Sequence, residues 1–133
     1  MWNYEQSTGK MTRGGVLLAV GYSGNDGGKN NPVMQDEVDI GPLPCGFYTL
    51  EPPVDSPRHG PFALPLVPDP SNTMFGRNEF MIHGDSLLEP GHASEGCIIL
   101  DREARMTMWN SNDKMLRVVA YEDTDGPLPD FKS

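Results

Sequence analysis

The chain has 133 residues, a hydrophobic content of 37% and a formal net charge of −9. This length fits one domain with its own core, and the acidity argues against a nucleic-acid-binding protein, which would need clustered Lys and Arg. No stretch is apolar for long enough to span a membrane. The 13 Pro and 15 Gly favour a turn-rich, mainly β protein over a helical bundle.

The N-terminal part of the chain predicts strands separated by a polar loop. Residues 2–4 predict a first strand, and the continuous apolar run at 16–22 predicts a strand at the centre of a sheet. Residues 23–31 are rich in Gly and Asn and predict a loop. A further strand is expected over 46–51, after the Gly-Pro-Leu-Pro sequence at 41–44.

Prolines interrupt the middle of the chain. Residues 51–61 hold four of them and predict a loop, in which we expect His59 to be a solvated histidine. The strand predicted over 62–67 contains Pro65, which cannot donate a ladder hydrogen bond, so we expect this strand at a sheet edge. Residues 68–77 predict another loop that leads toward the next strand.

A histidine and a cysteine lie in two short apolar runs. Phe-Met-Ile-His at 80–83 places His83 at a strand end, and Cys97 opens the run Cys-Ile-Ile-Leu at 97–100. Because side chains alternate along a strand, the two residues meet on one surface if the runs are neighbouring strands. The loop over 84–95 would then arch over the site.

This pair meets the needs of thiol chemistry. A free cysteine has a pKa of roughly 8.5, so an imidazole such as that of His83 is needed to take the proton and stabilise the thiolate. Gly96 lets the backbone approach closely before Cys97, where N–H groups could hold an oxyanion. A single Cys or His is commonly structural, but nucleophile, base and glycine together favour catalysis. We also expect Cys97 to be free, because a bond to Cys45 would block this chemistry.

The last part of the chain predicts one short helix and a final strand. Asp101 can cap a helix that runs to about 110, with Glu103 in its first turn. Residues 115–121 predict the last strand, and the acidic tail at 122–133 is expected to be poorly packed. We therefore expect a single catalytic domain over 1–121. The predicted core-facing stripe of the helix consists of Ala104, Met106, Met108 and Trp109.

Several of these sequences resemble one family. His-Gly at 83–84 followed by Ser-x-Gly-Cys-Ile at 94–98 resembles the L,D-transpeptidase (YkuD-like) cysteine enzymes of bacterial cell walls. Gly-Pro-Leu-Pro-Cys-Gly-Phe-Tyr at 41–48 is similar to their Gly-Pro-x-Pro-x-Gly-x-Tyr strand entry. Trp-Asn-Tyr at 2–4 with Thr-Gly-Lys-Met at 8–11 looks like their first hairpin. The resemblance implies a mainly β, L,D-transpeptidase-like twisted β-sandwich with one short helix after the catalytic cysteine strand.

The resemblance covers about residues 2–121 and has two departures. Glu95 stands where many members have His, and Ile99 stands where they have Arg or Asn, which leaves open how the substrate is positioned. The Ser-Glu-Gly-Cys-Ile form, the short chain and the segment 23–31 resemble a compact branch that includes effectors of type VI secretion systems. Those effectors act as toxins on a competitor's peptidoglycan.

The resemblance implies acyl transfer through a Cys97 thioester. Cys97 would attack the carbonyl between the meso-diaminoacid and the D-residue of a stem peptide, with His83 as base and then acid. The N–H groups of Gly96 and Cys97 would hold the oxyanion. Gly84 or Asp85 would orient His83. Water as acceptor gives L,D-carboxypeptidase cleavage, a free D-amino acid gives exchange, and a second stem gives a cross-link.

Further candidates concern substrate and partners. Asp85, Ser94, Glu95 and Arg77 are candidate substrate-binding residues: Asp85 could receive an ammonium, and Arg77 could pair with a carboxylate. No cofactor or metal is implied. Implied partners are peptidoglycan stem peptides, D-amino acids, a cognate immunity protein and the secretion apparatus. The N-terminus lacks the order of a secretory signal, so we expect synthesis in the cytoplasm and delivery to the periplasm of a target bacterium.

Three other interpretations remain open from the sequence. A zinc peptidase would use His83, Asp85 and either His92 or Cys97, but loose His/Asp/Cys spacing is weak evidence for a metal. A non-catalytic wall-binding or structural module on the same fold predicts that Cys97 is buried and inert. An acidic intracellular interaction domain would need neither the histidine nor the cysteine.

Overall fold

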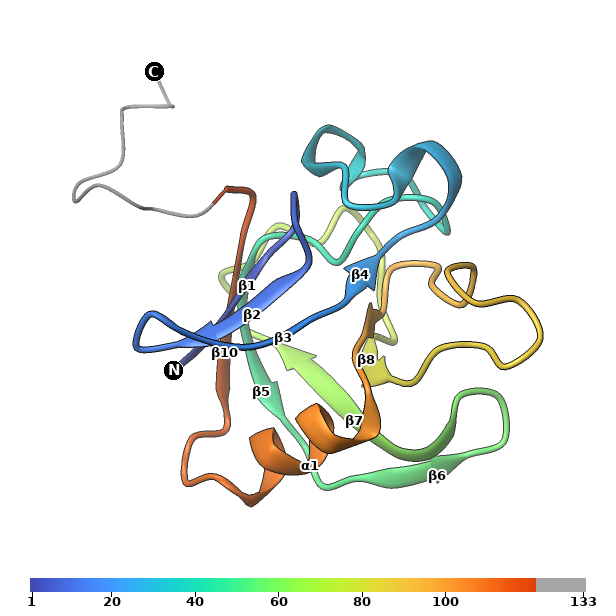
Figure 1. Cartoon of the computed structure of the whole chain (residues 1–133). Helices are drawn as coiled ribbons and strands as arrows, with labels where there is room; N and C mark the ends of the chain where they lie inside the picture. Colours follow the sequence, from blue (N-terminus) through green and yellow to red (C-terminus); the bar gives the residue numbers. More distant parts are fainter. Residues whose placement is uncertain (122–133) are drawn as a thin grey trace.

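The computed structural model describes residues 1–121, which form a ten-stranded sheet and one α-helix (Figure 1). The sheet order is β3-β2-β1-β10-β5-β7-β8-β9-β4, and β6 pairs with β7 beside this path. Two 3-10 helices, η1 (Asp26–Gly28) and η2 (Pro32–Met34), lie after β4, and the α-helix is α1 (Arg102–Asn110). The strands are β1 (Trp2–Glu5), β2 (Lys10–Arg13), β3 (Val16–Val20), β4 (Tyr22–Ser23), β5 (Gly46–Leu50), β6 (Val54–Ser56), β7 (Gly60–Pro68), β8 (Met81–His83), β9 (Ile98–Ile99) and β10 (Met115–Val119).

The sheet is mixed and surrounds one hydrophobic core. β10 runs parallel to β1, and β8 runs parallel to β9, whereas the other strand pairs are antiparallel. Helix α1 packs on β7 and β8. The prediction of a mainly β, sandwich-like fold with a short helix after the cysteine strand is confirmed. The largest fully buried apolar side chains are Tyr4, Tyr48, Met11, Leu43 and Leu64.

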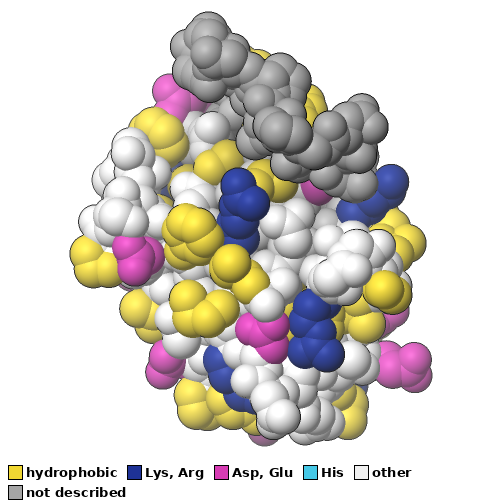
Figure 2. All heavy atoms as spheres, turned by 90° about the vertical axis from the view of Figure 1, so that its left-hand side faces the viewer, with side chains coloured by type: hydrophobic (Ala, Val, Ile, Leu, Met, Phe, Trp, Pro, Cys, Tyr) yellow, Lys and Arg dark blue, Asp and Glu magenta, His cyan; other side chains and the backbone are white. Residues whose placement is uncertain are grey.

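The apolar run at 16–22 is not a central strand, and that prediction is wrong. The run is divided at Gly21 into β3 and β4, which lie at opposite ends of the sheet. A Cβ on Gly21 would lie 1.7 Å from the Ile99 carbonyl oxygen, so the backbones touch there and the chain changes partner. On β3, Val16, Leu17 and Val20 are exposed. Figure 2 shows the face at the left of Figure 1, where hydrophobic side chains lie among charged ones and no histidine is visible.

The strand containing Pro65 is not at an edge, because β7 lies between β5 and β8. The Pro65 carbonyl accepts a hydrogen bond of 2.9 Å from the Glu51 N–H. The N–H and C=O of one residue point to the same side of an antiparallel strand, so the N–H that Pro65 lacks would face the end of β5. The ladder between β5 and β7 ends at the pair Leu50–Leu66, so the sheet does not need an N–H donor from Pro65.

Two other segments refine the predicted strands. The first hairpin is confirmed, since β1 and β2 pair antiparallel from Trp2–Arg13 to Tyr4–Met11. The loop predicted over 51–61 contains β6, which pairs with β7 between its flanking prolines. The last strand ends at Val119, and the tail at 122–133 lies outside the described residues.

Helix α1 follows the predicted pattern except on one face. The Asp101 side chain accepts a 2.8 Å hydrogen bond from the Ala104 N–H and caps the helix. Ala104 and Met108 are buried and Trp109 packs against the core, but Met106 is 39% exposed and does not belong to the core-facing stripe. Within residues 1–121, no helix has the length and apolar character that a membrane crossing requires.

Candidate active site

Strands β8 and β9 bring the predicted histidine and cysteine together. They pair in parallel, with Ile82 opposite Ile98 and His83 opposite Ile99, and Cys97 immediately precedes β9. The ligand atoms of His83 and Cys97 lie within 4.8 Å of each other. The prediction that the two runs are neighbouring strands is therefore confirmed.

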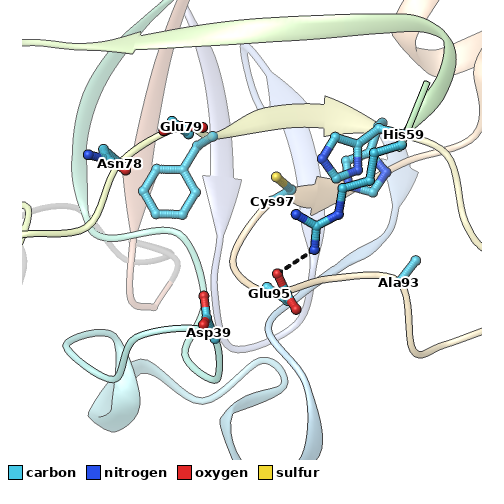
Figure 3. Close-up of a pocket in the computed structure, with 10 residues that line it drawn as sticks. Asp39, His59, Asn78, Glu79, Ala93, Glu95 and Cys97 are labelled. Carbon is cyan, nitrogen blue, oxygen red and sulfur yellow. Dashed lines mark hydrogen bonds and ion pairs between the residues drawn. The ribbon is translucent and has the colours of Figure 1, made fainter. Parts of the chain in front are cut away.

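The cysteine opens into a cavity of about 260 Å³. His83 lines this cavity together with Cys97, and carboxylates from Asp39, Glu79 and Glu95 contribute to its wall. Figure 3 shows the Cys97 sulfur in this pocket, with His59 on one side and Glu79 on the other. The cavity thus brings the thiol and two histidines together with three carboxylates.

His83 is held in one tautomer by a main-chain contact. Its Nδ1 lies 2.8 Å from the Gly84 carbonyl oxygen, which can only accept, so Nδ1 carries the proton and Nε2 keeps its lone pair. Nε2 is buried and has no hydrogen-bond partner among residues 1–121. Burial, with smaller effects from the neighbouring His59, Arg105 and Arg58, lowers the pKa of His83 to about 4, against the opposing Gly84 bond. The imidazole is therefore neutral at pH 7 and able to accept a proton.

Cys97 is a free, buried thiol. Its Sγ accepts a hydrogen bond of 3.4 Å from the Met81 N–H, which fixes the sulfur beside β8. Burial raises the pKa of the Cys97 thiol, and the Met81 bond opposes that rise. Cysteine and histidine are consequently a neutral pair at rest, and the proton moves only when the sulfur attacks. The prediction of a free Cys97 is confirmed, and Cys45 is free as well.

The turn before the cysteine requires Gly96 and is held by Ser94. Gly96 has φ +132°, and a Cβ there would lie 2.5 Å from Arg77 Nη2 and 2.6 Å from the Phe80 ring. Ser94 Oγ accepts from the N–H groups of Gly24 (2.8 Å) and Gly96 (3.0 Å) and donates to the Cys97 carbonyl (2.6 Å). Because its N–H is engaged by Ser94, Gly96 is a poor oxyanion donor, which leaves the Cys97 N–H as the candidate.

The Arg77 guanidinium is buried and bonded to main-chain carbonyls on two loops. Nη1 donates to Gln35 (2.6 Å) and Pro42 (2.8 Å), and Nη2 donates to Gly41 (2.9 Å) and Glu95 (3.2 Å). These four bonds engage the side of the guanidinium that a carboxylate would need. Arg77 therefore holds the loop before Cys97 in position. The sequence had led us to expect that Arg77 would pair with a substrate carboxylate, and its donors are not free for that role.

The two acidic candidates have partners of their own. Asp85 accepts hydrogen bonds from the Tyr22 hydroxyl (2.6 Å) and from the N–H groups of Ser86 (2.8 Å) and Gly91 (3.1 Å), which order the loop after β8. Glu95 forms an exposed ion pair with Arg58, 2.7 Å between Nη2 and Oε1 (Figure 3). Of the two residues considered for orienting His83, Gly84 makes the contact through its carbonyl.

His59 lines the site, so the prediction of a solvated loop histidine is wrong. Its ring stacks on that of His83 with centroids 4.2 Å apart and planes inclined by 24°. The ligand atoms of His59, His83 and Cys97 all lie within 4.8 Å of one another, the spacing of a possible metal site in residues 1–121. A metal lies in the plane of each imidazole that binds it. Because these rings are nearly parallel, they would have to rotate before both could bind one ion. The contact between His59 and His83 joins residues that are far apart in the sequence, so no local sequence pattern predicts it.

Comparison with known proteins places the chain in a family. A family model described as the Tlde1 domain matches residues 18–123 of the 133-residue chain. No curated protein and no solved structure matches the chain. The matched segment includes β8, β9 and the whole cavity wall described above. The protein belongs to the Tlde1 domain family, a group of type VI secretion effectors related to L,D-transpeptidases.

Proposed function

We propose that the protein is a peptidoglycan-modifying cysteine enzyme that acts on stem peptides through a Cys97 thioester. The observation that carries this proposal is the placement of Cys97 Sγ and the His83 ring in one cavity, within 4.8 Å, with His83 Nδ1 bonded to Gly84. Because Nδ1 carries the proton in that arrangement, Nε2 is the ring nitrogen that can accept the proton of the thiol. Membership in an effector family related to L,D-transpeptidases supports the same chemistry.

The proposed reaction moves one proton between sulfur, imidazole and the leaving amine. Cys97 Sγ bonds to the scissile carbonyl carbon while its proton passes to His83 Nε2. The C–N bond then breaks, and His83 returns this proton to the departing D-amino acid, which leaves a thioester on Cys97. Water or another amine attacks the thioester, gives its proton to His83, and the proton returns to the sulfur as the thiolate leaves. Water yields L,D-carboxypeptidase cleavage, and a D-amino acid yields exchange.

The acidic wall supports a diamino acid at the acyl position. Asp39 and Glu79 line the cavity of Cys97 together with Glu95, and among residues 1–121 only Glu95 of these three forms an ion pair, with Arg58. Carboxylates at this place would attract the free ammonium of a meso-diaminoacid in the stem peptide. Asp39 and Glu79 thus take the ammonium-binding role for which the sequence suggests Asp85.

The biological setting follows from the family. An effector domain indicates delivery into target cells, and we infer that this protein acts in the periplasm of a target bacterium as an antibacterial toxin. A producing cell would then need a cognate immunity protein, and the secretion apparatus would be a second partner. Peptidoglycan stem peptides and free D-amino acids are the proposed substrates.

The test is mass spectrometry of purified muropeptides incubated with wild-type protein or with Cys97→Ala. We expect wild type to remove the terminal D-alanine from tetrapeptide stems, or to exchange it for an added D-amino acid, and Cys97→Ala to do neither. The substitution is small, so circular dichroism should show an unchanged fold. Full activity of Cys97→Ala would contradict the mechanism.

A non-catalytic wall-binding module is the second candidate, and the burial of Cys97, 7% exposed, is the observation that favours it. The two candidates differ in the reactivity of the thiol. An enzyme predicts that iodoacetamide alkylates Cys97 in the native protein, and that His83→Gln slows the reaction. A module predicts slow alkylation that His83→Gln does not change, together with muropeptides that bind and remain intact.

A further inference from the structure

Helix α1 carries a buried arginine whose charge lacks a partner. Arg105 is 4% exposed, and its Nε and Nη1 are buried without a hydrogen-bond partner among residues 1–121. It takes part in neither of the ion pairs found in this part of the chain. A buried guanidinium is costly unless it is hydrogen-bonded and paired with an anion. Arg105 therefore has the properties of a residue that binds an anionic ligand.

Arg105 lies beside the residue that follows the candidate base, and it lines a cavity that Cys97 does not line. Its guanidinium packs against Gly84, where a Cβ would lie 3.1 Å from Nη1 and 3.3 Å from Nη2, so the glycine admits the arginine. Arg105 lines a second cavity of about 680 Å³. His83 and His59 line both this cavity and the one that holds Cys97. The two cavities thus meet at the imidazole of His83.

Within residues 1–121, no carboxylate forms an ion pair with Arg105, and the charge of Asp101 acts on it without a hydrogen bond. Asp85 and Glu89 also line the second cavity, but neither pairs with Arg105 in the described part of the chain. Asp85 is bonded to the Tyr22 hydroxyl and to N–H groups of its own loop. A planar guanidinium presents paired donors that match a carboxylate. Within residues 1–121, the donors Nε and Nη1 therefore remain available to the carboxylate of a ligand.

We propose that Arg105 binds the carboxylate of the departing or incoming D-amino acid. The inference rests on the proposed function, in which His83 gives its proton to the departing amine and takes one from the incoming amine. In an amino acid the carboxylate is attached to the carbon next to that amine, and one residue of extended chain spans about 3.5 Å. A carboxylate so placed can enter the second cavity, which His83 lines together with Arg105.

The first experiment measures kcat/KM for two stem peptides that end in D-alanine or in D-alaninamide. We expect wild type to prefer the free carboxylate by roughly 10- to 100-fold, the range of a charge-assisted pair of hydrogen bonds. Arg105→Met should reduce this preference to about one, Arg105→Lys should retain part of it, and the exposed Arg102→Met should leave it unchanged. An unchanged preference in folded Arg105→Met would overturn the proposal, and Arg105→Lys serves if the Met variant does not fold.

A second experiment does not depend on turnover. Cys97→Ala protein is titrated with D-alanine and with D-alaninamide while the Arg105 Nε–H resonance is followed by NMR. A shift with the acid alone supports the carboxylate site, even if no stem peptide is turned over by wild type and the proposed reaction fails. No shift with the acid, or an equal shift with the amide, overturns the site even if Cys97-dependent turnover is found.

Discussion

Two buried arginines lie next to the candidate site, Arg77 against Gly96 and Arg105 against Gly84, and their surroundings differ. Arg77 is 6% exposed and donates to four main-chain carbonyls behind Cys97. Arg105 is 4% exposed, and its Nε and Nη1 have no partner in residues 1–121. Burial and charge are the same for both. The hydrogen bonds of each nitrogen separate an arginine that builds a loop from one that is suited to bind a ligand.

The largest difference is expected in stability. Arg77→Met removes four charge-assisted hydrogen bonds and leaves buried carbonyls without donors, so we expect a loss of about 3–5 kcal/mol in the free energy of unfolding. Arg105→Met removes an unpaired buried charge and should change that free energy by at most about 1 kcal/mol, in either direction. Urea denaturation of both variants measures the difference. Equal losses would remove the distinction between the two arginines.

A serine on the Arg77 side sharpens the same comparison. Ser94→Ala deletes three hydrogen bonds and leaves the N–H groups of Gly24 and Gly96 unsatisfied, so we expect a loss of about 2–4 kcal/mol. Turnover should fall as well, because the turn that places Cys97 loosens. Ser86→Ala, in the exposed loop beyond His83, is the control and should cost less than about 1 kcal/mol. Similar denaturation midpoints for both variants would show that Ser94 does not hold the turn.

The protonation of His83 makes the stability of the protein depend on pH, and Arg105 contributes to the pKa of His83. The folded-state pKa of about 4 lies below the ordinary 6.5, so between these pH values the unfolded chain binds a proton that the folded protein does not. The free energy of unfolding should therefore fall as the pH drops from 6.5 toward 4. Burial is the main cause, and the charge of Arg105 is one of the smaller ones.

Arg105→Met should consequently raise the pKa of His83 and reduce this loss of stability in acid. Arg102→Met, on the exposed face of the same helix, should change neither. NMR titration of the His83 ring in the two variants and in wild type measures the pKa directly. A His83 pKa that is the same in Arg105→Met and wild type would mean that the arginine is too well screened to act on the imidazole.

The smallest effect is expected for the exposed pair between Arg58 and Glu95. These side chains are 70% and 53% exposed, so Arg58→Ala should change the free energy of unfolding by less than about 1 kcal/mol. Thermal melts at low and high salt measure this effect. A loss above about 2 kcal/mol, insensitive to salt, would place this pair with the buried network of Arg77.

Local patterns in the sequence predict the elements that carry the site. His83 and Cys97 each lie in a short apolar run, and those runs form β8 and β9. The helix after them begins at Asp101, whose side chain makes the cap that the residue type predicts. Gly96 is required where the sequence suggests a close approach. Each of these features depends on neighbours within a few residues, which the sequence displays directly.

The features that the sequence does not predict depend on distant partners. His59 reaches His83 from the turn between β6 and β7, and Arg105 reaches Gly84 from α1. Both are polar residues with no local pattern that marks burial. Pro65 lies inside the sheet because the neighbouring strand happens to end beside it. The apolar run at 16–20 does not show which strands it pairs with, and those pairings place β3 at an edge of the sheet.

The position of β10 has a consequence for biosynthesis. The last strand of the described chain lies between β1 and β5, and its two ladders join the N-terminal hairpin strands to β5. A nascent or newly translocated chain cannot complete its sheet until residues 115–119 have emerged. Pairing the first strand with the last is a contact of high sequence separation, which slows folding. The protein thus remains an incomplete sheet through most of its synthesis. In a chain that stops before residue 115, β1 and β5 would lack the strand between them, and the N-terminal hairpin would be linked to β9 only through Gly21 and β4.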